Sequence, residues 1–471
     1  MSYEKLYQAV EKHKNMILEA ERHIWKNPEP GYREWKTHAY LKEKYEALGY
    51  QLVEAGDIPG FYTDVDTGRP GPFVAVFGEM DSLIIPSHPE CDPETGAVHA
   101  CGHHCQSAAL LGLAAALKEP DVLDGLCGKI RLIAVPAEEG IEIEFRLGLK
   151  KDGIIKYMCG KPEFLHRGYL DGVDMAMMVH TAISGLSCPK GSNGALIKYA
   201  TFTGKSAHAG GSPHKGINAL YAATTALSAG NAIRETFQEK DTVRCHPIIT
   251  KGGNVVNAIP DEVITESYLR AATVEAMHTE GKKINRAYAG CAAAMGCGVH
   301  FTDVHGFAPR YNDPNMKAIF KEIGLDFFKE DQIRVTETWG TASSDMGDIA
   351  CVMPCVHPYV SGAQGASHSP EFVIVDPYTA CVVSAKIQFG MLAKLLENGG
   401  ERAKYVLENQ CVPYASKEEY FAAVDSLSFD GEGVFYNEDG TVKAYTPKYE
   451  DIPTRAKKRI IKLLNLDDLW N

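Results

Sequence analysis

Three strongly apolar segments, each ending in acids or a histidine, most constrain how this chain can fold. They read FVAVFGEMD (73–81), KIRLIAVPAEEG (129–140) and VDMAMMVHT (173–181), and a helical pattern, QSAALLGLAAALK, lies between the first two. Continuous apolar strands that alternate with helices are typical of a mainly parallel sheet with both faces covered. We therefore predict an α/β fold. Ligands of such sheets bind at the carboxyl ends of the strands, which here carry Asp81, Glu138, Glu139 and His180.

The pattern changes after residue 192, which indicates an inserted domain. The segment ALIKYATFTGKSAHA (195–209) alternates like a half-exposed strand. It is followed by a helix near 215–236, strands near 244–251 and 261–272, a helix near 274–296 and a strand near 298–306. After about 310 the helical and strand patterns of the first part return, ending in a long amphipathic helix at 377–397. We predict a main domain at 1–192 and 310–400, an inserted α+β domain at 193–309, and a C-terminal extension at 401–471.

The N-terminal segment and the cysteines together indicate a compartment. Apolar residues recur at helical spacing over 4–26, the turn NPEPG (27–31) ends that helix, and a second helix runs from about Glu34 to Leu48. The first helix is charged and amphipathic, unlike a secretory signal. The 13 cysteines are odd in number and irregularly spaced. We therefore expect reduced thiols and a cytoplasmic protein.

The composition argues against two classes of partner. The formal net charge is −13, from 48 Lys and Arg against 61 Asp and Glu, which disfavours a broad phosphate-binding surface and hence nucleic acid. We find no apolar run of about 18 residues, so we expect no membrane span.

The loop HACGHHC (99–105) is the first candidate for chemistry. Cys101 and His103 are two apart, and in an extended segment alternate side chains share a face, so both could reach one ion. Thiolate and imidazole suit Zn, while imidazole with carboxylate also suits Mn, Co or Ni. The alternative is a structural loop whose polar groups are satisfied by neighbours. The metal interpretation gains weight from further donors at strand ends or in a Gly/Ser loop, namely Glu138, Glu139, His180 and His368.

Eight short motifs in order resemble those of the co-catalytic metal amidohydrolases, which include aminoacylase-like enzymes, plant auxin-conjugate hydrolases and aminobenzoyl-glutamate hydrolase subunits. The motifs are NPEPGYRE (27–34), GEMDSL (78–83), HACGHHCQSAALLGLA (99–114), PAEEG (136–140), GKSAHAGGSPHKGINAL (204–220), GGNVVNAIPDE (252–262), SSDMGD (343–348) and GASHSPEF (365–372). GEMDSL and GTASSDMGD are similar to the aminobenzoyl-glutamate and dipeptidase branch. The resemblance implies a parallel-sheet metallopeptidase domain with an inserted lid and dimerisation domain.

The resemblance implies two divalent metal ions, Mn or Zn, with Co or Ni as alternatives. The positions that match the family's ligands are Cys101, His103, Glu139, His180 and His368. Five protein ligands are too few for two separate four-coordinate ions, so one ligand and one water would bridge them, and Cys101 is the candidate bridge. Glu138 matches the general base, which would deprotonate that water. A solvated acidic corner is the alternative for Glu138 and Glu139, and Gly140 would permit the backbone turn that separates their roles.

Two further residues match supporting positions, and two depart from the family pattern. Asp81 would orient a ligating histidine through a hydrogen bond, and Asp345 would do likewise or cap a helix. His104 stands where the family has Asp or Asn. We expect it to be one of three things: an extra ligand, a group that supports a ligand, or a surface residue. Cys105 we expect to be a buried thiol that packs in the helix.

The inserted domain carries three residues that match substrate-binding positions. His208 would reach across a homodimer formed through this domain and polarise the scissile carbonyl of the partner's substrate; otherwise it is a turn histidine. Asn257 and Arg270 match positions that hold the substrate carboxylate, which suits the planar guanidinium. The alternative for Arg270 is a surface salt bridge.

The resemblance implies an enzyme, a metal-dependent amidohydrolase or peptidase. Its substrate would be a small amide with a free carboxylate: an N-acyl or N-aroyl amino acid similar to aminobenzoyl-glutamate, or a short dipeptide. A general N-acyl-amino-acid amidohydrolase (aminoacylase) is the alternative. A non-catalytic metal-binding homologue would not need a base, and the presence of Glu138 argues against it.

Overall fold

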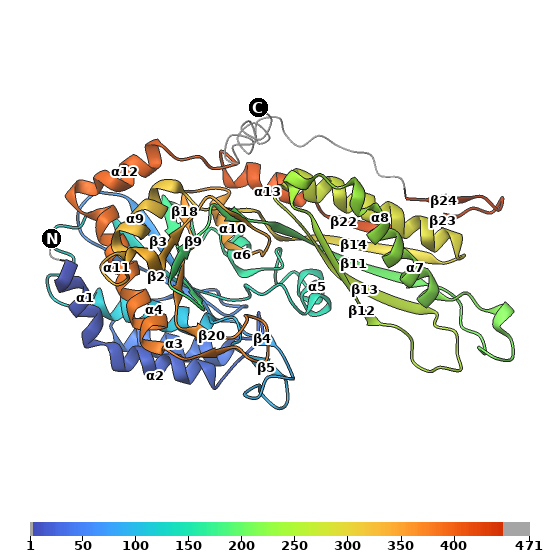
Figure 1. The fold of residues 1–471 in the computed structure, drawn as a ribbon, viewed down its shortest axis with the longest axis horizontal. Coiled ribbons are helices and arrows are strands. Elements are labelled where there is room, and N and C mark those ends of the chain that lie inside the picture. The colour runs from blue at the N-terminus through green and yellow to red at the C-terminus, as the bar shows by residue number, and fades with distance from the viewer. Residues whose placement is uncertain (1–2, 446–471) are drawn as a thin grey trace. The chain divides into compact units, whose positions relative to one another are not determined.

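The chain folds into two units, each assembled from segments far apart in the sequence (Figure 1). The computed structural model describes residues 3–445. Unit 1 comprises the chain up to Gly191, Tyr311–Gly340 and Asp348–Val412, and unit 2 comprises Ser192–Arg310, Thr341–Gly347 and the chain from Pro413. The second unit is therefore more than the single insertion at 193–309 that we predicted from the sequence. Residues 446–471 of the expected extension lie outside the described residues.

The core of unit 1 is a mixed sheet whose central strands are parallel. Its order is β1-β2-β6-β3-β7-β18, and β6, β3, β7 and β18 pair in parallel, as predicted. The strands are β1 (Val53–Glu54), β2 (Phe61–Asp66), β3 (Phe73–Glu79), β6 (Lys129–Val135), β7 (Met175–Met177) and β18 (Cys355–Val356). β3 and β6 are buried along almost their whole length because their side chains are apolar on both faces.

One wholly buried helix, α4 (His103–Ala116), packs directly on β3, and α1, α2 and α11 pack on α4 (Figure 1). The contact with β3 is close: a Cβ at Gly78 would lie 3.2 Å from Leu110 Cβ. The other helices of unit 1 are α1 (Tyr3–Lys12), α2 (Lys14–Trp25), α3 (Trp35–Ala47), α5 (Ile143–Lys151), α6 (Gly160–His166), α9 (Pro314–Gly324), α11 (Ser384–Leu396) and α12 (Glu401–Glu408). The first residues of α4 therefore lie beside the carboxyl end of β3.

Smaller sheets complete unit 1. A four-stranded sheet contains β8 (His180–Ala182), β9 (Leu186–Cys188), β16 (Ile333–Val335) and β19 (Tyr359–Ser361). Two hairpins pair β4 (Leu83–Ile84) with β5 (Ala97–Val98), and β20 (Ala363–Gln364) with β21 (Val373–Ile374). Short elements occur where the chain changes unit: β10 (Gly191–Ser192), β15 (Arg310–Tyr311), β17 (Trp339–Gly340) and α10 (Met346–Ala350).

Two helical segments differ from the sequence expectation. The predicted helix at 4–26 is broken at His13 into α1 and α2. The stretch Tyr378–Leu396, a π-helical turn followed by α11, is long and apolar enough to cross a membrane by length and composition, although no such run was expected. Within the structure 89% of its apolar window is buried, and its side chains belong to the core of unit 1.

Unit 2 is built on a five-stranded antiparallel sheet, on which helices α7 and α8 pack. Its order is β12-β13-β11-β14-β22. The elements are β11 (Gly194–Thr203), α7 (Ala219–Ala232), β12 (Arg244–Lys251), β13 (Glu262–Ala271), α8 (Val274–Ala294), β14 (Gly298–Phe307), α13 (Lys417–Asp425), β22 (Phe429–Glu432), β23 (Val434–Tyr436) and β24 (Val442–Ala444). β13 alternates between buried and half-buried positions because one face packs on α7 and α8. The edge strand β22 comes from the C-terminal part of the chain.

Candidate metal centre

Cys101 and His103 flank the N-terminus of α4. Gly102 lies between them with a φ of 99°, a left-handed conformation that costs a residue with a side chain about 1–2 kcal/mol. We predicted an extended segment here from the sequence, and that is wrong: Cys101 lies in a turn and His103 is the first residue of α4. A glycine turn, rather than the alternation of a strand, brings the two side chains together.

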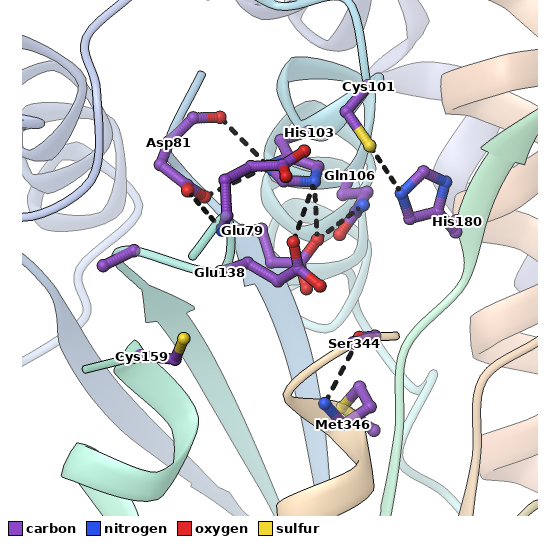
Figure 2. A network of polar contacts seen from close by, with 12 residues as sticks. Glu79, Asp81, Cys101, His103, Gln106, Glu138, Cys159, His180, Ser344 and Met346 are labelled. Atoms are coloured by element: carbon purple, nitrogen blue, oxygen red, sulfur yellow. Dashed lines mark hydrogen bonds and ion pairs between the residues drawn. The ribbon is translucent and has the colours of Figure 1, made fainter. Parts of the chain in front are cut away.

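The five residues that resemble metal ligands converge in unit 1 into two overlapping groups. Cys101, His103 and His180 form one group, and Cys101, Glu139 and His368 form the other; within each, the candidate ligand atoms lie within 4.8 Å of one another. Cys101 Sγ is 3.5 Å from His180 Nε2 (Figure 2). Glu139 Oε1 is 3.3 Å from His368 Nε2. Cys101 belongs to both groups, which is the position of a bridging ligand.

The donor atoms fit divalent metal ions. Metal–ligand distances of about 2.0–2.3 Å at tetrahedral angles separate the ligand atoms of one zinc ion by about 3.3–3.6 Å, which the two separations above match. His103 Nε2 and Glu139 Oε1 are buried and make no hydrogen bond of normal geometry. Buried polar atoms without a hydrogen bond are costly, and a bound cation would offset that cost. Thiolate, imidazole and carboxylate together suit Zn, and the last two also suit Mn, Co or Ni.

The surroundings of Cys101 favour ionisation of its thiol. A cysteine must be deprotonated to bind a metal ion. Burial and the charge of Glu139 oppose the thiolate, but His103 and His180 outweigh them and lower the pKa of Cys101 to about 6. The histidines therefore stabilise the thiolate, which is the form that binds metal.

Asp81 holds two of the candidate ligand residues in place. His103 Nδ1 lies 3.0 Å from Asp81 Oδ1 and 3.0 Å from the Asp81 carbonyl oxygen, so its N–H has acceptors there and Nε2 is left to face the centre (Figure 2). The other carboxylate oxygen accepts from the Glu139 backbone N–H at 2.8 Å. A carboxylate behind a histidine fixes the tautomer and the ring orientation of a metal ligand.

Glu79 is a residue at this centre that we did not select from the sequence. Its side chain is fully buried, and Oε2 lies 3.2 Å from His103 Nε2. Lys161 of α6 forms an ion pair with Oε1, and Gln106 of α4 donates to Oε2 at 2.9 Å. The motif GEMD could have identified Glu79 from the sequence. It places Glu79 and Asp81 two apart at a strand end, where alternation puts both side chains on one face.

Glu138 and Glu139 follow a backbone turn just beyond β6. We expected the turn at Gly140, but the positive φ is at Ala137, with 57°. Glu34 accepts from the Ala137 N–H at 2.7 Å, and the buried Arg146 guanidinium donates to the Ala137 and Glu139 carbonyls. These contacts hold the strained residue. Glu138 is buried, and its Oε2 lies 3.9 Å from His103 Nε2 (Figure 2).

His104 is not a surface residue. It is fully buried and belongs to a separate group with Glu21 and Cys105. Cys105 is likewise fully buried in α4.

The remaining candidate residues, His208, Asn257, Arg270 and Asp345, lie in unit 2. His208 is exposed, its Nδ1 accepts from the backbone N–H groups of Gly210 and Gly211, and its loop pairs with the loop of Asn257, which is also exposed. The Arg270 guanidinium donates to Ser343 Oγ at 3.1 Å. Asp345 is buried and directly precedes α10, where Ser344 Oγ accepts from the Met346 N–H.

Comparison with known proteins places the chain in a family. Residues 75–387 match Peptidase family M20/M25/M40. The Xaa-Arg dipeptidase of Homo sapiens is 28% identical over 389 residues, 78% of this chain and 80% of that protein. A p-aminobenzoyl-glutamate hydrolase subunit of Escherichia coli (strain K12) is 31% identical over 259 residues, 52% of this chain and 55% of that protein. A dinuclear metal binding peptidase from Bacillus subtilis has a similar fold, with a TM-score of 0.60, 19% identity, and 82% of this chain and 99% of that chain covered.

The fold and the buried group of thiol, imidazole and carboxylate donors define a hydrolase of the metallopeptidase class. The chain belongs to Peptidase family M20/M25/M40, which confirms the resemblance seen in its motifs, the predicted α/β fold and its identification as an enzyme that cuts amide or peptide bonds.

Proposed function

We propose that this enzyme hydrolyses the amide bond of an N-acyl or N-aroyl amino acid, similar to aminobenzoyl-glutamate, or of a short dipeptide. The observation that carries the proposal is the pair of donor groups that share Cys101, with Glu138 beside them. The substrate classes come from the relatives, which include a dipeptidase and an aminobenzoyl-glutamate hydrolase subunit. A general aminoacylase activity is the alternative within the same chemistry.

Residues of unit 1 would hold the ions and move the proton. Cys101, His103, Glu139, His180 and His368 would bind two divalent ions, which when bound polarise the substrate carbonyl and acidify water. The Glu138 carboxylate accepts a proton from the attacking water and returns it to the leaving nitrogen. Burial of Glu138 and of its neighbours keeps bulk water away from this transfer.

Residues of unit 2 would bind the substrate. Arg270, whose guanidinium donates to the neutral Ser343, keeps its charge available for a substrate carboxylate, and Asn257 would donate a second hydrogen bond. His208 Nδ1 accepts two backbone N–H groups, so the ring would carry its proton on Nε2 and donate it to the carbonyl oxygen as negative charge develops there.

We also propose a homodimer through unit 2 and a cytoplasmic location. β12 is an edge strand of the unit 2 sheet, and Ile248 and Ile249 on it are 52% and 36% exposed. An exposed apolar edge strand is a surface for pairing with another chain. The 13 free cysteines support a reducing compartment.

The proposed function is tested with a panel of amides. Aminobenzoyl-glutamate, N-acetyl amino acids and Xaa-Arg dipeptides are incubated with the enzyme reloaded with Mn or Zn, and released amino acid is measured with and without a chelator. We expect one substrate class to be cleaved and chelation to abolish cleavage. Hydrolysis that survives complete metal removal, or no cleavage of any member by the metal-loaded enzyme, contradicts the proposal.

A further inference from the structure

A second group of metal-ligand types lies in the interior of unit 1, apart from the centre described above. Glu21 of α2 and His104 and Cys105 of α4 place one ligand atom each within 4.8 Å of one another. Their residues are 4%, 0% and 0% exposed. Nothing in the proposed amide hydrolysis uses these side chains.

The two distances from His104 Nε2 to the other candidate ligand atoms are those found between ligands of one ion. His104 Nε2 is 3.4 Å from Cys105 Sγ and 3.3 Å from Glu21 Oε1. Ligand atoms about 2.0–2.3 Å from a tetrahedral zinc ion lie about 3.3–3.6 Å apart. The Cys101–His180 and Glu139–His368 pairs of the main centre show the same separations, 3.5 and 3.3 Å.

Both neighbours approach the same nitrogen of His104, Nε2. The other ring nitrogen, Nδ1, is buried and has no hydrogen-bond partner among the described residues. A cation placed between the sulfur, the carboxylate oxygen and the imidazole nitrogen would bind all three atoms.

A further thiol lies beside Cys105 on a third element, outside the three atoms that lie within 4.8 Å of one another. The Cys381 thiol, in Tyr378–Val383, is hydrogen-bonded to Cys105 and is fully buried. α2, α4 and Tyr378–Val383 pack against one another around the group. The Trp25 ring packs 4.9 Å from the His104 ring and covers one side, and Arg22 donates to Glu21 Oε1 at 3.1 Å and orients that carboxylate.

We propose that Glu21, His104 and Cys105, completed by the Cys381 thiol after a change of its rotamer, form a structural site for one zinc ion, additional to the ions of the catalytic centre. Two sulfurs, one nitrogen and one oxygen in a site without solvent access are a donor set for a closed four-coordinate structural zinc. The ion crosslinks α2, α4 and Tyr378–Val383. Since α4 begins at His103, it also holds the helix that presents a catalytic-centre ligand.

The first test counts zinc ions in the full-length protein by mass spectrometry after reloading and removal of excess metal. His104→Gln and Cys105→Ala should each bind one zinc ion fewer per chain than the wild type. The control Cys91→Ala changes a partly exposed cysteine outside both groups and should bind the same number as the wild type. Equal zinc content in the wild type and both variants overturns the site.

A second test detects the sulfur ligands of the group directly. Cobalt replaces zinc in Cys101→Ala, which removes the thiolate of the catalytic centre and leaves Cys105 and Cys381 in place. A sulfur-to-cobalt charge-transfer absorption should persist, and should disappear in Cys101→Ala combined with Cys105→Ala and Cys381→Ala. Absence of this absorption from the folded Cys101→Ala protein overturns the proposal, whatever the outcome for the catalytic centre.

Discussion

Glu138→Gln keeps the size and shape of the side chain and removes the proton acceptor. We expect turnover to fall by about 10²–10⁴-fold, the usual cost of losing a general base, while the content of bound metal stays the same. Steady-state hydrolysis and metal analysis measure the two effects. The control Glu144→Gln changes an exposed residue of α5 and should leave both unchanged. Activity of Glu138→Gln above about a hundredth of wild type would assign the base to another residue.

Lys161→Met removes the lysine that pairs with the buried Glu79 carboxylate. Breaking a fully buried ion pair costs about 3–5 kcal/mol, and Glu79 also lies 3.2 Å from His103 Nε2. We therefore expect a lower free energy of unfolding, measured by urea denaturation, and a partial recovery when Glu79→Gln is added. The control Lys251→Met breaks the exposed pair with Glu262, with side chains 43% and 44% exposed, and should change stability by under about 1 kcal/mol. A loss no larger than this in Lys161→Met would show that the buried pair contributes little.

At the scale of elements, the turn before α4 can be tested by comparing two glycine substitutions. One adds both backbone strain and a close contact, and the other adds strain alone. Gly102→Ala places a Cβ in a left-handed conformation and 3.0 Å from Thr181 Cβ, so both strain and a displaced ligand loop are expected. Gly49→Ala is the matched control, because Gly49 also has a positive φ, 80°, but its Cβ would meet nothing within 4 Å. Both should lose about 1–2 kcal/mol of stability from strain, and only Gly102→Ala should bind zinc more weakly in competition with a chelator. Equal zinc affinity of the two variants would contradict a role for Gly102 in placing Cys101 and His103.

At the scale of elements, the sequence predicts much of the fold because periodicity is local. The strands at 73–81 and 129–140 and the α-helices and strands from β11 to β14 follow from apolar spacing, whereas the three short 3-10 turns between them do not. The break at His13 and the turn at Ala137 do not, because packing and distant contacts decide them. Ala137 is held by Glu34 and Arg146, neither of which its own segment contains. Glu79 was missed for a similar reason: its partner Lys161 is 82 residues away.

At the scale of the whole molecule, the C-terminal segment contributes to both units, which its sequence pattern did not indicate. α12 packs on α11 in unit 1, and β22 pairs with β14 to add an edge strand to the sheet of unit 2. Within the described residues β22 and β12 are therefore the two edge strands of that sheet. β22 is short and carries the exposed acids Asp430 and Glu432, whereas β12 is longer and exposes Ile248 and Ile249. Charges on a short edge strand disfavour pairing with another chain, so the proposed dimer would use β12.

Ile248→Lys places a charge on β12, which disfavours the pairing of an edge strand with another chain. We expect the wild type to sediment at twice the mass of the 51.5 kDa chain and the variant to dissociate at micromolar concentration. Metal content should stay unchanged, because the ligands belong to unit 1. If His208 acts on the partner's substrate, turnover should fall as the dimer dissociates. Val53→Lys is the control, because Val53 is 45% exposed on β1, the edge strand of the other main sheet, and it should leave mass and turnover alone. A wild type that is monomeric and fully active at every concentration would remove both the dimer and the role of His208 across it.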